Sequence, residues 1–433
     1  MKKSAFALVV GFCAVFILSS CGGYNNNRNR TPSHVTERVM VSQGVTTGTS
    51  FGAVYIVNGQ NDTIPGLTPL SAGSAPGLMT LSPTRNIAAA FDASSNTVFG
   101  INTVAQASIG SVRLSGPTSS MVIPNAIPIG YAAVPSATVP GFSFIGAIDV
   151  MNFSSNSLTT IAVSNAQSVF SNANGTQLLV LSNDSDSITL ISPQSAVPPV
   201  DTSCQSSLPN AVCTVVPGFD RPVYAVISGG TAYIMNCGLQ CGGTQASVSI
   251  FDLASETITS TIPVDAATIG FASGSTLYVA GTPTTNNACD GQTTAATVCG
   301  RLDLVDLGSQ TVVSSAVITD GFHQRMDMTT NGQLFIGSKG CTSIGDVHSP
   351  SGEVRGCLSI YKTADGSVII PPDNGTVDGL QGFISRNVEY VAEGGALRVY
   401  DTNKDILLIN NFLPEGSINI PGYIGDVKAI DFF

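Results

Sequence analysis

Pairs of short stretches with alternating apolar and polar residues recur along the chain. The segments ASVSIFDLASETITSTIPV, RLDLVDLGSQTVVSSAVI and ALRVYDTNKDILLI share one form, as do FDASSNTVFGINT and CLSIYKTADGSVII. In each, an alternating strand runs into a turn of Asp, Asn, Gly, Ser or Thr, and a second alternating strand follows. Alternation with a period of two is typical of β-strands that bury one face. These segments therefore predict antiparallel hairpins.

A second kind of hairpin precedes most of the first kind. QSVFSNANGTQLLVLS, VYAVISGGTAYIMN and TIGFASGSTLYVAG each contain an apolar strand, a turn bearing Gly or Asn, and another apolar strand. Together the two hairpins make a four-stranded unit that repeats about every 45 to 50 residues. Such a repeat predicts a β-propeller, in which each sheet buries its faces by packing on the next. The expected fold class is therefore all-β, with blades of four antiparallel strands.

The ends of the chain bear on how the ring closes. The expected innermost strands begin near residues 77, 119, 167, 222, 267, 324, 381 and 426. This count favours eight blades, and seven are possible if the unit at 119–165 or 167–217 merges with a neighbour. The last candidate, DVKAIDFF, ends the chain, while FGAVYIVNGQNDTI near the start lacks an inner pair. We expect DVKAIDFF to pair with the segment around Val54, so that N- and C-terminal strands close the ring.

The repeats resemble those of the YVTN-type and bacterial lactonase-like propellers. The resemblance rests on TLYVAG, ASVSIFDLASETITSTI and ALRVYDTNKD, and it extends over most of residues 76–410. It implies a propeller and, from the lactonase-like members, a hydrolase with a site on the axial channel face. Because the match lies in single repeats, it bears on the fold more than on the function.

The first residues have the pattern of an export signal. A pair of lysines precedes the apolar run 6–18, and two serines come before Cys21. Charge, apolar run and small residues in this order are typical of a secretory signal peptide. The LSSC stretch also resembles the lipobox of bacterial lipoproteins, which implies cleavage before Cys21 and acylation of its thiol. Two or three acyl chains would hold the protein stably at a bilayer.

The same pattern predicts the location and the domain boundaries. Gly22, rather than Asp, follows the cysteine, which in the bacterial sorting pattern favours the outer membrane, on either its periplasmic or its surface side. Residues 22–48 carry mostly Asn, Arg, Ser, Thr and Gly. We expect a lipoprotein signal peptide over 1–20, a polar flexible tether over 21–48, and the propeller over 49–433.

Eight further cysteines agree with export. They are near neighbours in sequence: Cys204 and Cys213, Cys237 and Cys241, Cys289 and Cys299, Cys341 and Cys357. An even number in an oxidising compartment indicates disulfides, and these local pairs would each close one short loop. Other pairings are open, because eight cysteines allow 105 of them. A metal site is not expected, since the chain has three histidines and no CxxC pair.

Composition excludes some partners. The formal net charge is −11, only 10% of residues are charged, and no basic cluster occurs, which argues against nucleic acid and anionic lipid. Ser, Thr, Asn, Gln and Gly must therefore cover the surface. The chain has no Trp, and quinone-binding propellers use this residue heavily, so a dehydrogenase with a bound cofactor is disfavoured. We expect no cofactor.

Aspartates recur at one place in the repeats. Asp252, Asp306 and Asp401 each begin the turn of a hairpin. Because a catalytic residue would not recur from repeat to repeat, we expect these carboxylates to accept backbone N–H groups two residues further on.

Chemistry would have to come from loops that enter the innermost strands, such as GFDRP and DGFHQRMD. An arginine can clamp a carboxylate at two points, and a histidine can move protons near neutral pH. Asp–Arg pairs that merely hold neighbouring blades are the favoured alternative, because no base and nucleophile are paired by spacing. Asp184 and Asp186 could hold a cation, although a plain polar turn is favoured. The candidates near the axis are Asp220, Arg221, Asp320, His323, Arg325 and Arg386.

Two functions from different classes follow. The first, which we favour, is a membrane-anchored binding scaffold that recognises an envelope protein or glycan through its loops and is not an enzyme. The second is a lactonase-like hydrolase centred on His323 and the axial Arg and Asp residues. Three of the cysteine pairs fall in loops between second and third strands, so they would stiffen a recognition rim or simply staple exported loops.

Overall fold

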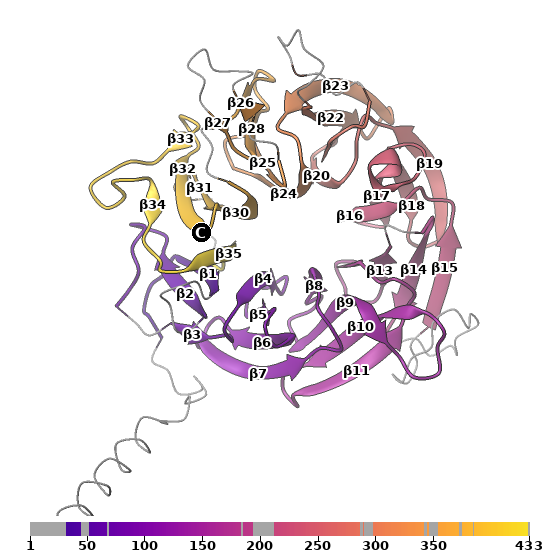
Figure 1. Cartoon of the computed structure of the whole chain (residues 1–433), viewed down its shortest axis with the longest axis horizontal. Helices are drawn as coiled ribbons and strands as arrows, with labels where there is room; N and C mark the ends of the chain where they lie inside the picture. The colour runs from indigo at the N-terminus through magenta and orange to yellow at the C-terminus, as the bar shows by residue number, and fades with distance from the viewer. Residues whose placement is uncertain are drawn as a thin grey trace, which may run out of the picture.

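The chain folds into a closed ring of eight blades around a central axis (Figure 1). This computed structural model describes residues 32–44, 52–66, 69–182, 185–193, 212–285, 289, 298–341, 344–345, 354–371, 375–383 and 385–431. The prediction of an all-β propeller with four-stranded antiparallel blades is confirmed, with eight blades rather than seven. The signal peptide, Cys21, Asp184 and Cys204 lie outside the described residues.

Blades 1 to 4 occupy half of the ring, and their strands are given from the axis outward. Blade 1 consists of β35 (Tyr423–Ala429), β1 (Arg38–Gly44), β2 (Ala53–Asn58) and β3 (Leu70–Ser71). Blade 2 consists of β4 (Pro76–Leu81), β5 (Ile87–Asp92), β6 (Thr97–Asn102) and β7 (Ala107–Arg113). Blade 3 consists of β8 (Ser120–Val122), β9 (Ile129–Thr138), β10 (Ile145–Asn152) and β11 (Ser157–Ala162). Blade 4 consists of β12 (Ser168–Ser171), β13 (Leu178–Leu181), β14 (Ser187–Ser192) and β15 (Val212–Pro217).

Blades 5 to 8 complete the ring. Blade 5 consists of β16 (Pro222–Ser228), β17 (Thr231–Asn236), β18 (Ser247–Asp252) and β19 (Thr257–Pro263). Blade 6 consists of β20 (Ile269–Ser273), β21 (Thr276–Gly281), β22 (Gly300–Asp306) and β23 (Thr311–Ile318). Blade 7 consists of β24 (Phe322–Met328), β25 (Gln333–Lys339), β28 (Leu358–Lys362) and β29 (Val368–Ile369). Blade 8 consists of β30 (Val377–Phe383), β31 (Val388–Glu393), β32 (Ala396–Asp401) and β33 (Ile406–Leu407), with β34 (Ser417–Ile418) also beside β32.

Two small elements lie in loops between second and third strands. The 3-10 helix η2 (Gly238–Cys241) follows β17, and a hairpin of β26 (Ile344–Gly345) and β27 (Val354–Arg355) lies between β25 and β28. In the described part of the chain, no helix has the length and hydropathy needed to cross a membrane.

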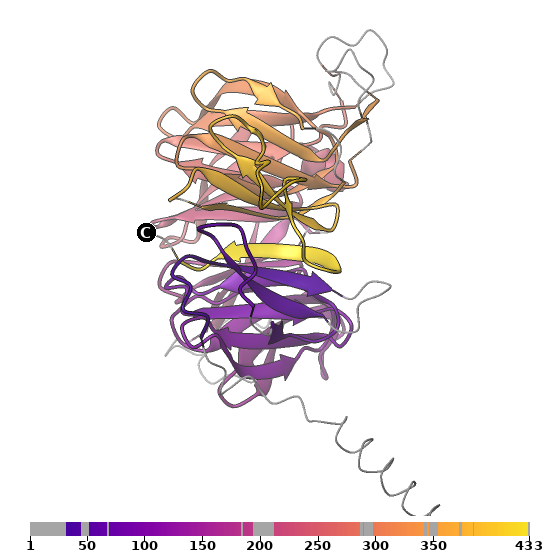
Figure 2. The same ribbon diagram turned by 90° about the vertical axis from the view of Figure 1, so that its left-hand side faces the viewer.

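The two ends of the chain share blade 1, as the sequence predicts, but through a different strand pair. The C-terminal strand β35 is innermost and lies beside β1 (Figure 2). In this pairing Val41 faces Val427 and Val39 faces Ala429. The segment around Val54 is β2, on the far side of β1. The prediction that DVKAIDFF pairs directly with it is therefore wrong. Residues 38–44 also belong to the ring and not to the predicted tether, because β1 hydrogen-bonds on both edges.

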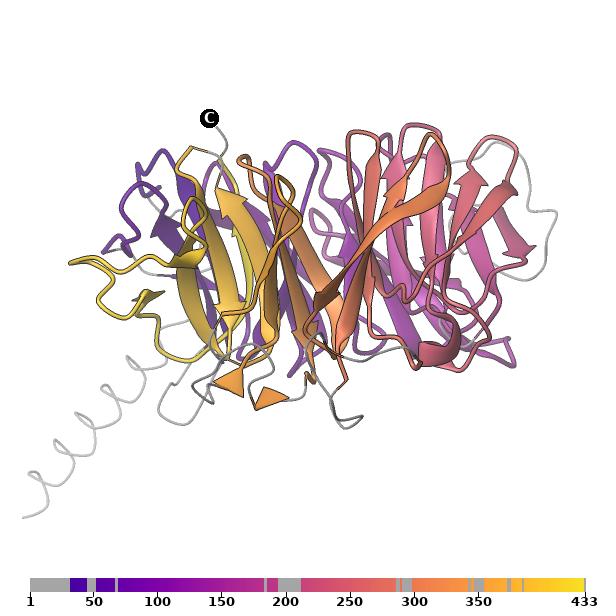
Figure 3. The same ribbon diagram turned by 90° about the horizontal axis from the view of Figure 1, so that it is seen from above.

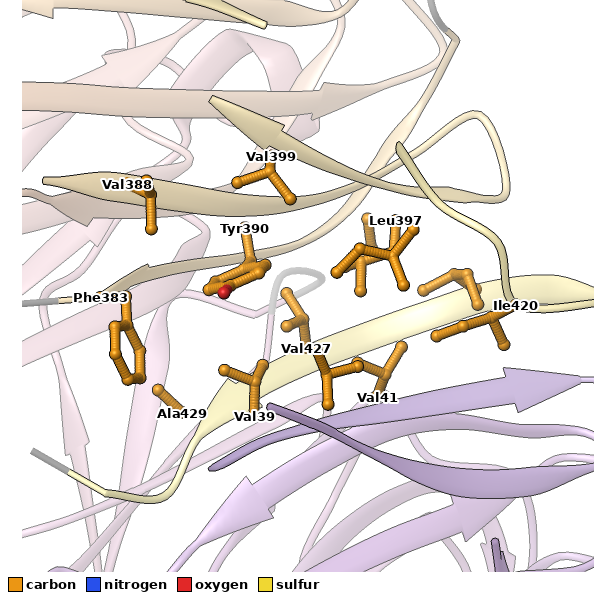
Figure 4. Close-up of a cluster of buried hydrophobic side chains, with 14 of the residues drawn as sticks. Val39, Val41, Phe383, Val388, Tyr390, Leu397, Val399, Ile420, Val427 and Ala429 are labelled. Carbon is orange, nitrogen blue, oxygen red and sulfur yellow. The ribbon is translucent and has the colours of Figure 1, made fainter. Parts of the chain in front are cut away.

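The seam between blades 8 and 1 shows how the ring is held. Val39 and Val41 of β1 and Val427 of β35 pack against Tyr390 and Leu397 of blade 8, and all are buried (Figure 4). Burial of each such aliphatic side chain contributes about 1.5–3 kcal/mol. Similar clusters lie between the other blades, so each sheet completes its core only with its neighbours.

The recurring aspartates cap turns, as predicted. The carboxylate of Asp401 accepts the Asn403 backbone N–H at 2.9 Å. Asp252 and Asp306 instead accept N–H groups three residues on, from Ser255 and Ser309, both at 2.6 Å. Their role is local turn stabilisation.

Candidate functional site

One face of the ring carries the loops that join second to third strands and the loops that enter the innermost strands. We call it the rim face. Figure 3 shows the ring edge-on, with η2 on this face and the C-terminus of the chain on the opposite one. Disulfides link Cys237 to Cys241, Cys289 to Cys299, and Cys341 to Cys357, one in each of the consecutive blades 5, 6 and 7. Three predicted pairs are thus confirmed, and they indicate an oxidising compartment.

Asp220 anchors the loop of blade 5 that carries η2. Its carboxylate accepts the backbone N–H groups of Thr244, at 2.9 and 3.0 Å, and of Gln245, at 2.7 Å, and it also accepts the Thr244 hydroxyl. Burial pushes the pKa of Asp220 upward, but these hydrogen bonds outweigh burial and hold the pKa below its ordinary value. Asp220 is thus a structural residue whose acceptors are already engaged.

A groove of about 270 Å³ lies beside this loop, between blades 5 and 6. Its polar lining is mainly neutral, and the Gln240 side chain, which reaches across, accepts the Thr282 backbone N–H at 3.2 Å. Leu239 in η2 is 54% exposed at its edge. The lining includes Leu239, Gln240, Thr244, Gln245, Asp265 and Thr284.

A larger cavity of about 460 Å³ lies on the axis, near the ends of the innermost strands that face the rim. It is lined by residues of six blades, among which Arg325 is the one charged side chain. Its guanidinium donates to two backbone carbonyls, from Nε to Asp378 O at 2.6 Å and from Nη1 to Gln324 O at 3.1 Å. Among the described residues, the cavity lining therefore presents hydroxyl, amide and apolar groups around one cation.

His323 does not face this cavity. It is fully buried, and its Nε2 lies 2.9 Å from the backbone carbonyl of Thr319. Burial lowers the pKa of His323 to about 4, although the Thr319 carbonyl works against this. Neutral at pH 7 and without contact to the cavity, His323 is poorly placed for proton transfer to a ligand.

The other predicted candidates do not converge with Arg325. Arg386 lies in the hairpin between β30 and β31, on the face opposite the rim, and binds the Asp62 carboxylate at two points, 2.7 and 2.8 Å. Arg386 does not line the axial cavity, and its pair with Asp62 joins blade 8 to blade 1. Arg221 lies 3.8 Å from Asp186, a pair between blades 4 and 5. Asp320 is buried, and its backbone carbonyl accepts the Ser338 hydroxyl at 2.8 Å.

A pair of neighbouring carboxyl groups, of which Glu389 is buried and Asp327 is partly buried, was missed by the sequence analysis. The carboxylate of Asp327 in β24 accepts the Gly382 backbone N–H at 2.6 Å. The Glu389 carboxyl lies beside the same glycine, close to the position that a Cβ atom would take. A Cβ at Gly382 would come within 3.0 Å of Glu389 Oε2 and 3.4 Å of Asp327 Oδ2. Burial, and next the charge of Asp327, raise the pKa of Glu389 well above its ordinary value. Burial also raises the pKa of Asp327, and the backbone N–H groups of Gly382 and Met328 oppose this rise.

The described residues contain no cluster of three or more His, Cys, Asp or Glu side chains suited to a metal ion.

Comparisons with known proteins find the fold again but no family. No protein-family profile and no curated protein matches the chain. The chain is similar to the dihydro-heme d1 dehydrogenase NirN, solved in complex with DHE, at 13% identity and a TM-score of 0.61, over 94% of this chain and 77% of that one. It is also similar to the Dos1 propeller, at 8% identity and a TM-score of 0.54, over 81% and 85%.

A third similar structure is a putative 6-phosphogluconolactonase from Bacteroides fragilis NCTC 9343. It has 10% identity and a TM-score of 0.49, over 92% of this chain and 100% of that one. At such identities the likeness extends to the propeller fold alone.

Proposed function

We propose that this protein is an exported, lipid-anchored binding module that recognises an envelope glycan with its rim face. The observation that carries the proposal is the position of the three disulfides, all in second-to-third-strand loops of adjacent blades. A crosslink restricts a loop before it binds, which lowers the ordering cost of association. Loops that are restrained before binding are therefore expected at a surface that recognises a ligand.

The groove between blades 5 and 6 suggests the chemistry of the ligand. Gln240, Gln245 and Thr284 offer amide and hydroxyl groups, which match the hydroxyls of a sugar, and Leu239 offers an apolar edge. A nucleic acid would need a basic surface, whereas the chain carries a formal net charge of −11. Anchoring through Cys21 would keep such a module close to the envelope.

The test is cosedimentation of the purified protein, without its signal, with purified insoluble peptidoglycan. Thr284→Arg should place a bulky cation in the groove and abolish sedimentation. Thr176→Arg is the matched control, because Thr176 lines a cavity of about 380 Å³ at the hairpins of blades 3 and 4, away from the rim. Equal loss in both variants, or none in Thr284→Arg, would refute the groove as the binding site. Failure of the native protein to sediment, together with a protein captured at the rim, would replace the glycan by a protein partner.

A further inference from the structure

A backbone irregularity in β24 brings two adjacent side chains to the axial cavity. The pairing of β24 with β25 joins His323 to Ser338 and Arg325 to Gly337, so that Gln324 is an extra residue, a β-bulge. Neighbouring side chains of a regular strand point to opposite faces, and a bulge overrides this. Gln324 and Arg325 therefore both line the cavity.

The bulge itself belongs to the fold, but its chemistry in blade 7 differs from that of the other blades. The innermost strands β4, β16, β30 and β35 have similar register shifts near the same end. At these places β4 and β16 contribute Leu78 and Val223 to the cavity. In blade 7 alone among these cavity-lining bulges, a polar amide and a cation stand side by side.

The two side chains have hydrogen-bond donors without acceptors. Gln324 Nε2 is buried and has no hydrogen-bond partner among the described residues. Arg325 bonds only backbone carbonyls, and no carboxylate of the described residues forms an ion pair with it. The Asp378 carboxylate nearby already accepts from Lys339 at 2.8 Å and Tyr423 at 2.6 Å. Unused donors beside an unneutralised cation call for an acceptor that carries negative charge.

Two hydroxyl groups of the lining are already engaged in hydrogen bonds between blades. Ser120 Oγ accepts the Val169 N–H at 2.9 Å, and Thr268 Oγ1 donates to the His323 carbonyl at 2.9 Å, so both tie neighbouring blades together. The apolar part of the lining includes the rings of Phe170 and Tyr224, whose centroids are 5.0 Å apart in an edge-on arrangement. Phe322, 40% exposed, adds a third ring.

We infer that the axial cavity binds a small organic anion, with its carboxylate on Arg325 and Gln324 and a flat apolar body against Phe170 and Tyr224. The cavity volume, about 460 Å³, lies within the range of small-molecule sites. The site is separate from the groove between blades 5 and 6, so it does not depend on whether the rim binds a glycan.

Calorimetric titration with benzoate tests the inference, with benzamide as the neutral isostere. Benzoate should bind saturably, with a Kd on the order of 1 mM or tighter, and at least about tenfold better than benzamide. Gln324→Glu keeps the shape of the side chain and adds a negative charge, so it should weaken benzoate at least about tenfold and leave benzamide unchanged. Arg325→Gln should remove the preference for benzoate.

Arg113→Gln provides the matched control, because Arg113 is exposed at the end of β7 and should leave benzoate binding as it is. Thermal unfolding of each variant separates loss of the site from loss of the fold, and Gln324→Glu remains informative if Arg325→Gln does not fold. The inference is overturned if benzoate shows no saturable binding, if benzamide binds equally well, or if Gln324→Glu changes nothing. If inorganic phosphate binds as tightly as benzoate, the assignment of Phe170 and Tyr224 as contacts for an apolar body is overturned.

Discussion

Replacing Glu389 by glutamine should remove a pH-dependent loss of stability that is built into the ring. Glu389 is 0% exposed, and neither of its carboxyl oxygens has a hydrogen-bond partner among the described residues. Burial is the main cause of its raised pKa, the charge of Asp327 adds to it, and a weak interaction with the Gln381 backbone opposes it. Burial raises the pKa of Asp327, and the charges of Lys428 in β35 and of Arg85 in the β4–β5 hairpin act against this rise. Between the ordinary and the raised pKa, the folded protein therefore holds a proton on Glu389 that the unfolded chain has lost.

The sign and size of the effect follow from this difference in proton binding. The stabilising contribution of the protonated Glu389 is complete below the ordinary carboxyl pKa, 4.5, and is lost as pH rises toward the raised folded pKa. Over that range the free energy of unfolding falls by about 1.4 kcal/mol per pH unit for one group. Glutamine has the shape of the neutral carboxyl, so Glu389→Gln should match the native protein near pH 4, and its advantage in the free energy of unfolding should grow as the pH rises above 4.5.

Urea unfolding followed by circular dichroism between pH 4 and pH 8 measures this. Glu415→Gln is the matched control, because Glu415 is exposed and its replacement should leave the pH profile of the native protein unchanged. If the profiles of native protein and Glu389→Gln run parallel, then Glu389 is not protonated in the folded ring and the reasoning fails.

Three further predictions concern the seam, the rim and the anchor. Arg38→Ala removes a partly buried ion pair with Asp431, in which the two hydrogen bonds are 2.6 and 2.7 Å long. The substitution should lower the free energy of unfolding, measured by urea titration, by about 1.5–3 kcal/mol. An unchanged urea midpoint would contradict the role of this pair in joining the two ends of the chain. Asp220→Ala should speed backbone hydrogen exchange at Thr244 and Gln245 by about tenfold or more and leave the exchange of β1 unchanged. An equal increase in exchange rate across the ring would show that Asp220 does not act on the blade 5 loop alone. Cys21→Ser should move the protein from the membrane fraction to the soluble fraction, and retention in the membrane would exclude the lipid anchor.

The repeat pattern was enough to predict the ring, because most strands pair with the next strand in sequence. Each such hairpin shows in the sequence as two alternating segments joined by a turn. The expected innermost strands near residues 77, 222 and 324 correspond to β4, β16 and β24. The strand β1 was missed because RVMVSQG has its inner partner almost 400 residues away and follows a polar stretch, so no local hairpin reveals it. β1 can be recognised as a strand of the ring only once the last strand of the chain is known to pair with it.

The candidate sites were harder to predict for two physical reasons. A bulge interrupts the alternation of side chains between the two faces, but the residues at this bulge, His323, Gln324 and Arg325, are all polar. The sequence DGFHQRMD therefore gives no sign that Gln324 and Arg325 both line the cavity. The middle strands are buried on both faces by adjacent blades, as in β31 with every residue buried, so alternation cannot separate buried from exposed acids there. Glu389 therefore looks like a surface residue in sequence.

The rim face as the recognition surface is tested most directly by photo-crosslinking in intact bacterial cells. A photoreactive amino acid is placed at Thr284 in the rim groove or at Thr176 near the opposite face, in otherwise identical proteins. We predict an irradiation-dependent adduct of the envelope from position 284 and none from position 176. An adduct from position 176 alone would contradict the assignment of the rim face as the recognition surface.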